Sequence, residues 1–249
     1  MVAYDLQLPI DAAHVGLPST SATVILAVDE PLDVGWLQDP TNSSRRWCSM
    51  SGLHLTPALI RTHGMQRGIH LELTPLGSRA LFGAPLAAVA GHTVDLADLP
   101  RGLNPAEHEA VTAPATWAAR LATLEALLLD RLQAAHLAAD LRRAWQLLRA
   151  GHRVSWVADE VGWSRRHLAN RVRSEFGVSP KELGRLARFQ NASRMVQSGL
   201  PLAQAAQAAG YADQAHLSRE WKTFAGRSPS TCTEPFPNLQ DLLATHSPD

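Results

Sequence analysis

The stretch AAGYADQAHLSREWKTFAGRSP, residues 208–229, decides the fold of the second half of the chain. Leu217 and Trp221 are four positions apart, as on the buried side of a helix. Gly210 precedes this helix and Gly226 follows it, and glycine suits the left-handed conformation at which helices often end. The pattern predicts a helix, a tight turn and a second helix that keeps one polar side open.

The same pattern occurs once before, at an offset of 49 residues. Leu168 is followed after eight residues by Gly-Val-Ser-Pro, as Leu217 is by Gly-Arg-Ser-Pro. Upstream, VADEVG (157–162) corresponds to AAQAAG (205–210). Between the copies, Ser179 and Glu182 flank Pro180 in the pattern of a capping box, which predicts a helix that joins them.

Two helix-turn-helix units in tandem indicate DNA recognition, because such a unit lays its second helix in the major groove. Arginine pairs well with guanine, and asparagine or glutamine with adenine. A merely solvated helix face is the alternative, although it would more often carry Glu–Lys pairs. The candidate DNA-binding residues are Arg165, Arg166, Asn170 and Arg173 in the first copy and Gln214, His216, Ser218, Arg219 and Lys222 in the second.

The charge distribution favours the same interpretation, although the net charge of the 249 residues is zero. Residues 1–130 hold 7 basic and 13 acidic residues, whereas residues 131–230 hold 16 and 7. Of those 16 basic residues, 14 are arginine, which contacts phosphate and guanine in a bidentate manner. Only the second half is therefore expected to meet a polyanion.

The first half is predicted to be rich in strands. Apolar runs such as residues 22–28 and 69–73 lie between clusters of Gly, Pro, Ser and Asn. An apolar stripe at spacings of four, three and four then predicts a helix over residues 117–128. The stripe either packs on its own domain, which we favour, or pairs with a second copy of the chain. The expected domains are 1–130 (β-rich, ending in a helix), 131–235 (double helix-turn-helix) and 236–249 (flexible acidic tail).

These motifs resemble the AraC-type family of bacterial transcription regulators. The similarity rests on GYADQAHLSRE, AGRSP and EFGVSPKELGRLARFQNA, and covers roughly residues 138–232. A weaker similarity links residues 68–99 to the sensor domain of one subgroup. The resemblance implies an α+β protein in which a cupin-like or related β domain precedes two helix-turn-helix units joined by a linker helix. It also implies two recognition helices about 34 Å apart, in successive major grooves.

The resemblance further implies roles and partners. The expected partners are double-stranded DNA, RNA polymerase if the protein activates transcription, and a small-molecule effector bound by the first domain. A homodimer is the open alternative to a single chain. The roles of the candidate residues differ. The base readers would be Arg166, Asn170, Gln214 and His216, with Arg165 and Arg219 as additional candidates. Phosphate would be contacted by Arg173 and Lys222, and Ser218 could do either.

Other functions find less support in the sequence. His54, His63, His70 and Cys48 lack the spacing of metal ligands, so neither a metal nor a cofactor is expected. No nucleophile motif or phosphate-binding glycine loop is present, and the protein is not expected to be an enzyme. A DNA-targeted modifying or repair enzyme and an architectural DNA binder stay as alternatives. Trp36, Trp47 and residues 52–67 either line an effector pocket or, as we favour, belong to the core.

The expected location is the cytoplasm, at the nucleoid. The first residues, MVAYDLQLPID, lack the basic region of a signal peptide. No run approaches the roughly 18 apolar residues that a membrane span needs, and two cysteines cannot build a disulfide framework.

Overall fold

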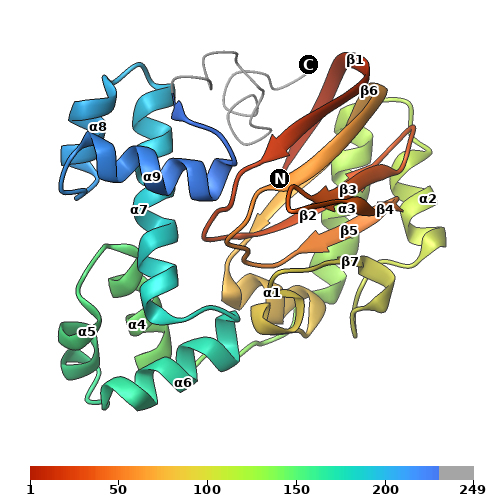
Figure 1. Ribbon diagram of the computed structural model, residues 1–249. Helices are drawn as coiled ribbons and strands as arrows, with labels where there is room; N and C mark the ends of the chain where they lie inside the picture. The colour runs from red at the N-terminus through yellow and green to blue at the C-terminus, as the bar shows by residue number, and fades with distance from the viewer. Residues whose placement is uncertain (230–249) are drawn as a thin grey trace.

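The structure is a computed structural model that describes residues 1–229, apart from the side chains of Asp11, Ala12 and Thr62. The expected tail, residues 236–249, lies outside the described residues. An antiparallel sheet comes first and helices follow (Figure 1). No helix within residues 1–229 is both long and apolar enough to cross a membrane. The strands are β1 (Val2–Gly16), β2 (Ala22–Ala27), β3 (Leu32–Trp36), β4 (Asp39–Arg46), β5 (Cys48–Ser51), β6 (Ala58–Leu73) and β7 (Thr93–Asp95).

The long strand β6 organises the sheet, which has the order β4-β3-β6-β2-β5-β7. One edge of β6 pairs with β1, and its other edge is shared between β3 and β2. Side chains alternate between the two faces, as expected for strands. Ile69 and Leu71 face the helices, whereas His70 between them faces a cavity on the other side. The strands predicted at residues 22–28 and 69–73 are thus present.

Helices follow the sheet in two groups. The first group covers one face of the sheet and one of its ends, and the second group forms the separate helical half (Figure 1). The first group is α1 (Pro75–Phe82), the short 3-10 helices η1 (Leu86–Val89) and η2 (Leu96–Asp98), α2 (Pro105–Thr112) and α3 (Trp117–Arg131). The second group is α4 (Ala139–Arg149), α5 (Val154–Glu160), α6 (Arg165–Phe176), α7 (Pro180–Gln197), α8 (Leu202–Ala208) and α9 (Gln214–Ala225).

The apolar stripe of α3 packs on its own domain. Leu124 is fully buried, and Trp117, Leu121 and Leu128 are partly buried against the same hydrophobic core. Leu129, on the other side of the helix, is 62% exposed. The stripe is therefore used within the chain.

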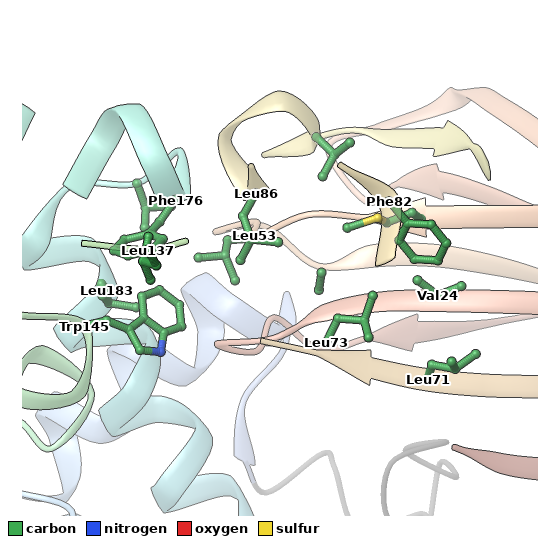
Figure 2. Packing of buried hydrophobic residues seen from close by; sticks show 14 of the residues in the cluster. Val24, Leu53, Leu71, Leu73, Phe82, Leu86, Leu137, Trp145, Phe176 and Leu183 are labelled. Carbon is green, nitrogen blue, oxygen red and sulfur yellow. The ribbon is translucent and has the colours of Figure 1, made fainter. Parts of the chain in front are cut away.

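One hydrophobic core runs from the sheet into the first helix-turn-helix unit without a break. Figure 2 shows Leu53 and Leu86 lying between the sheet residues on one side and Trp145 and Phe176 on the other. Leu137, in the segment between α3 and α4, is 4% exposed and belongs to this core. The β domain and the first unit therefore share apolar burial, the dominant favourable term in folding.

The second helix-turn-helix unit has a core of its own. Phe189 of α7 contacts the rings of Trp221 and Phe224 at centroid distances of 5.4 and 4.9 Å. Helix α7 joins the two units, with Leu183 in the first core and Leu186 in the second. Its start is the predicted capping box.

Candidate nucleic-acid interface

The two recognition helices, α6 and α9, are built alike. Ser164 and Asp213 cap their first turns by accepting hydrogen bonds from the amides of His167 and His216. Gly177 and Gly226 end them in the left-handed conformation, at φ values of 79° and 73°. The sequence repeat is therefore a structural repeat of α5–α6 and α8–α9. This confirms the prediction of two helix-turn-helix units.

The open side of α6 carries the residues that were predicted there. Leu168 and Val172 are fully buried, and Arg166, Asn170 and Arg173 are exposed on the opposite side. The fourth candidate, Arg165, lies in the first turn of α6 and is also exposed.

The open side of α9 differs in part from the expectation. Gln214, Arg219 and Lys222 are exposed, as predicted. His216 and Ser218 are half-buried, and the ring of His216 lies edge-on to Tyr211 at a centroid distance of 5.2 Å. The sequence reasoning missed two exposed residues, although a step of 100° per residue from Leu217 places both on the open side. They are Ala215 and Thr223.

Two glutamates of the recognition helices are withdrawn from the open sides. Glu175 accepts two hydrogen bonds from Arg79 of α1, at 2.5 and 2.7 Å. Glu220 accepts from Arg185 of α7 at 2.5 Å and from the Tyr211 hydroxyl at 3.0 Å. Burial and Glu220 raise the pKa of Tyr211, so its hydroxyl stays a donor. Neither carboxylate would repel a DNA phosphate from the open sides.

Both recognition helices end against the β domain. A Cβ atom added to Gly177 would lie 2.1 Å from the Cβ of Ala90, just after η1. One added to Gly226 would lie 2.1 Å from a methyl group of Leu37. Glycine at these positions therefore ends the helix and also leaves room for the β domain to pack against that end. The opposite ends, with Arg166 and Gln214, point away from the β domain (Figure 1).

The curved face of the sheet holds a cavity of about 90 Å³. Apolar residues such as Ile25 and Ile60 line it together with His14, His54 and His70. Burial lowers the pKa of His14 and of His70 to about 4, so both rings are neutral near pH 7. Several residues of the 52–67 stretch therefore line a cavity instead of filling the core. Trp36 and Trp47 do not line it, and the assignment of Trp47 to the core is wrong, because its side chain is 44% exposed.

The histidines do not assemble into a metal site. His54 and His70 share the cavity, but His63 lies elsewhere, 3.7 Å from a carboxylate oxygen of Asp33. Within the part of the chain that the structure describes, no three His, Cys, Asp or Glu side chains are placed to hold a metal ion.

A family model described as a helix-turn-helix domain matches residues 157–234, which begin in α5 and include both recognition helices. These residues form a helix-turn-helix domain of the AraC type. For this half of the chain, the match confirms the prediction of an AraC-type, DNA-binding transcription regulator. A comparison with curated protein sequences finds no match.

Solved structures with the same arrangement of domains come from ToxT of Vibrio cholerae. The apo form of a ToxT variant has a TM-score of 0.58 at 10% identity, covering 92% of this chain and 95% of that one. ToxT with a bound unsaturated fatty acid has a TM-score of 0.54 at 11% identity, covering 100% and 96%. ToxT bound to (E)-4-(8-methylnaphthalen-1-yl)but-3-enoic acid has a TM-score of 0.55 at 11% identity, covering 92% and 96%. These likenesses establish the fold, a β-rich domain followed by two helix-turn-helix units.

Proposed function

We propose that this protein regulates transcription by reading two successive major grooves of double-stranded DNA with α6 and α9. The observation that carries the proposal is the repeated construction of the two helices. Each is capped alike, ends at a left-handed glycine against the β domain, and presents cationic and amide side chains from its far end. Recognition helices read bases from their N-terminal turns, which are here the ends away from the β domain.

The proposed role of each residue follows from its side-chain chemistry and its position along the helix. Base reading falls to side chains near the helix starts, because arginine matches guanine and amides match adenine. Phosphate contacts fall to Arg173 and Lys222 in later turns, and the half-buried Ser218 could serve either purpose. The proposed base readers are Arg166, Asn170, Gln214 and His216, with Arg165 and Arg219 as additional candidates.

A selection experiment followed by footprinting tests this function. The full-length protein would be used to enrich binding sites from a pool of random DNA duplexes, and the enriched site would then be footprinted. Two recognition helices one helical turn apart should protect about 20 base pairs. Protection of half that length would mean that only one helix reads DNA. Failure to enrich any site would contradict sequence-specific recognition and favour an architectural DNA binder.

The β domain is the proposed sensor, and its cavity is the proposed effector site. A buried charge is costly without a partner, and the three histidines around the cavity are depressed in pKa and neutral. The cavity is smaller than the roughly 150 Å³ that accommodates benzene. It therefore favours an uncharged molecule of a few heavy atoms that hydrogen-bonds to imidazole. ToxT structures instead hold larger carboxylic acids.

The walls of this cavity also touch the second helix-turn-helix unit. Leu17 lines the cavity and packs against the core of that unit. Close by, the amide and hydroxyl of Thr20 both donate to the side-chain oxygen of Gln190 in α7, at 3.2 and 2.9 Å. A ligand that moves the segment around Leu17 would therefore shift α7 and with it α9. This contact supports an effector-responsive regulator.

Thermal unfolding in the presence of small molecules tests the effector site. A ligand that binds only the folded protein stabilises it by RT ln(1 + L/Kd), where L is the free ligand concentration, so the unfolding midpoint rises with the logarithm of ligand concentration once the site is saturated. Uncharged alcohols and amides should stabilise the wild type, and the shift should be lost in His70→Leu but kept in His92→Leu, which alters an exposed histidine. Stabilisation by carboxylates alone would contradict the proposed ligand class.

Activation through RNA polymerase and a cytoplasmic location at the nucleoid follow from the resemblance and stay predictions. Dimerisation likewise stays a prediction, but the structure limits how α3 could take part. Because its apolar stripe is used within the chain, a second copy would have to contact the opposite side, which carries Ala122, Ala126 and Leu129.

A further inference from the structure

A cleft of about 450 Å³ lies between the two helix-turn-helix units, along the first half of α7. One wall comes from the connection between α4 and α5, with Arg153. The other comes from the first turns of α9, with His216. Lys181, Gly184 and Arg188 of α7 lie between these walls. Figure 1 shows α7 spanning the two units, and the cleft lies beside the first half of α7, next to the start of α9.

The charge of the cleft is positive. Its lining contains four cations, which face one carboxylate, that of Glu220. This carboxylate is already bound by Arg185 and by the Tyr211 hydroxyl. Arg153 and Lys181 are exposed and, within the described part of the chain, form no ion pair. The cleft therefore offers cationic charge that its own acid does not neutralise.

Gly184 forms part of the floor of the cleft, in the interior of α7. Glycine is the weakest helix former apart from proline, and a glycine inside a helix needs a reason. The backbone there is ordinary, since Gly184 does not have a positive φ. A Cβ atom added to it would meet only the carbonyl oxygen of Leu148, at 3.8 Å. Among residues 1–229 no neighbour requires glycine here, but the missing side chain lets a partner approach the backbone of α7 closely.

The position of the cleft identifies that partner. Both recognition helices end against the β domain, so their starts form the proposed DNA-facing side, and His216 brings the first turn of α9 into the wall of the cleft. Two successive major grooves on one side of B-DNA are separated by a minor groove and the phosphodiester backbones that border it. We propose that this cleft holds the phosphodiester backbone between the two major grooves, with Arg153, Lys181 and Arg188 binding its phosphates above Gly184. The inference rests on the proposed DNA-reading function.

Salt-dependent DNA binding by charge variants of α7 tests the proposal. The full-length protein would be titrated onto the duplex that it selects from a random pool, at several salt concentrations. Loss of one phosphate contact lowers the slope of log K against log salt by about 0.9. We expect this change in Lys181→Ala. Arg194→Ala, which removes the same charge from an exposed position on the other side of α7, should keep the wild-type slope.

A second pair of variants tests the floor of the cleft. Gly184→Glu places a carboxylate where we expect phosphate, so affinity should fall by about tenfold or more. Its unfolding midpoint should not fall, because the added Cβ has room and glutamate favours the helix. Gln197→Glu adds the same charge at an exposed position away from the cleft and should bind within about twofold of the wild type.

The outcomes separate this inference from the function on which it rests. If the wild type selects no DNA site, the proposed function fails and the cleft has no backbone to bind. If the wild type binds its site, but Lys181→Ala keeps the full salt slope and Gly184→Glu keeps the wild-type affinity, the cleft inference alone is overturned.

Discussion

Arg79 of α1 binds Glu175 of α6 through two parallel hydrogen bonds, 2.5 and 2.7 Å long, across 96 positions of sequence. Glu175 is 7% exposed, and this pair ties the end of the first recognition helix to the β domain. The presence of Glu175 also raises the pKa of Arg79, so the guanidinium stays charged. In the sequence repeat the matching position is Phe224, which is buried in the core of the second unit. At this position the first unit therefore has a side chain that contacts the β domain, where the second unit has a core residue.

Glu175→Ala should lower the free energy of unfolding by about 1–3 kcal/mol, because Arg79 would lose both acceptors at a partly buried site. Glu160→Ala is the matched control. Its carboxylate is bound by Arg143 at 3.3 Å on the surface, so the loss should stay below about 1 kcal/mol. Urea unfolding of both variants provides the measurement. Equal losses would mean that the Arg79–Glu175 pair stabilises the protein no more than a surface ion pair does.

Gln214→Ala should weaken binding to the selected DNA site by about 1–3 kcal/mol and relax the base preference at one position. The reason is that an amide at the start of α9 would lose its paired hydrogen bonds to a base. Gln207→Ala, in the exposed part of α8, should leave both properties unchanged. Site selection repeated with each variant gives the result. An unchanged preference in Gln214→Ala would mean that the orientation of α9 on DNA is wrong.

The protein should lose stability as the pH falls below about 6.5, in part because of its buried histidines. Burial lowers the pKa of His14 and His70 from 6.5 to about 4. The unfolded chain therefore binds protons near pH 6.5 that the folded protein binds only near pH 4. Each histidine should cost up to about 3 kcal/mol over this range. Urea unfolding between pH 7.5 and pH 5 should show a shallower loss in His70→Gln than in the wild type or in His92→Gln. A slope that His70→Gln does not change would show that this ring is not buried in its neutral form.

Leu124→Ala should destabilise the protein by about 2–5 kcal/mol, because it leaves a cavity in the core between α3 and the sheet. Leu129→Ala changes the same residue type five positions later, where the side chain is 62% exposed, and should alter stability by less than about 0.5 kcal/mol. Thermal and urea unfolding compare the two. The opposite order would mean that α3 packs through its other side.

Local patterns explain which features the sequence could predict. The recognition helices, their caps and the linker helix depend on residues a few positions apart, such as Leu217 and Trp221 or Ser179 and Glu182. Repetition of the pattern reinforced each prediction. The β domain was predicted as strands and one helix, because alternation and helical spacing are also local signals.

Contacts between distant segments could not be predicted. Nothing near Glu175 in the sequence distinguishes a buried, clamped carboxylate from a solvated one. The cavity likewise has both His14 and His70 in its lining, although the register of β1 against β6 pairs His14 with Ile60 and His70 with Val2. Their meeting therefore depends on the three-dimensional course of the two strands. The half-buried state of His216 depends on Tyr211, which belongs to the preceding turn. The division at residue 130 stays a prediction, although the first core extends across it.

The two separate cores have a consequence for chimaeric regulators. A graft that took only the helical half would strip Leu53 and Leu86 away from Trp145 and Phe176 and leave apolar surface open on both fragments. The boundary between the cores falls inside α7, after Leu183 and before Leu186. An exchange of the part that follows Leu183 would leave the first cluster intact, and the incoming segment would have to keep the apolar surface that packs against Leu17. The second half of the binding site is therefore easier to exchange than the first half, which shares its core with the β domain.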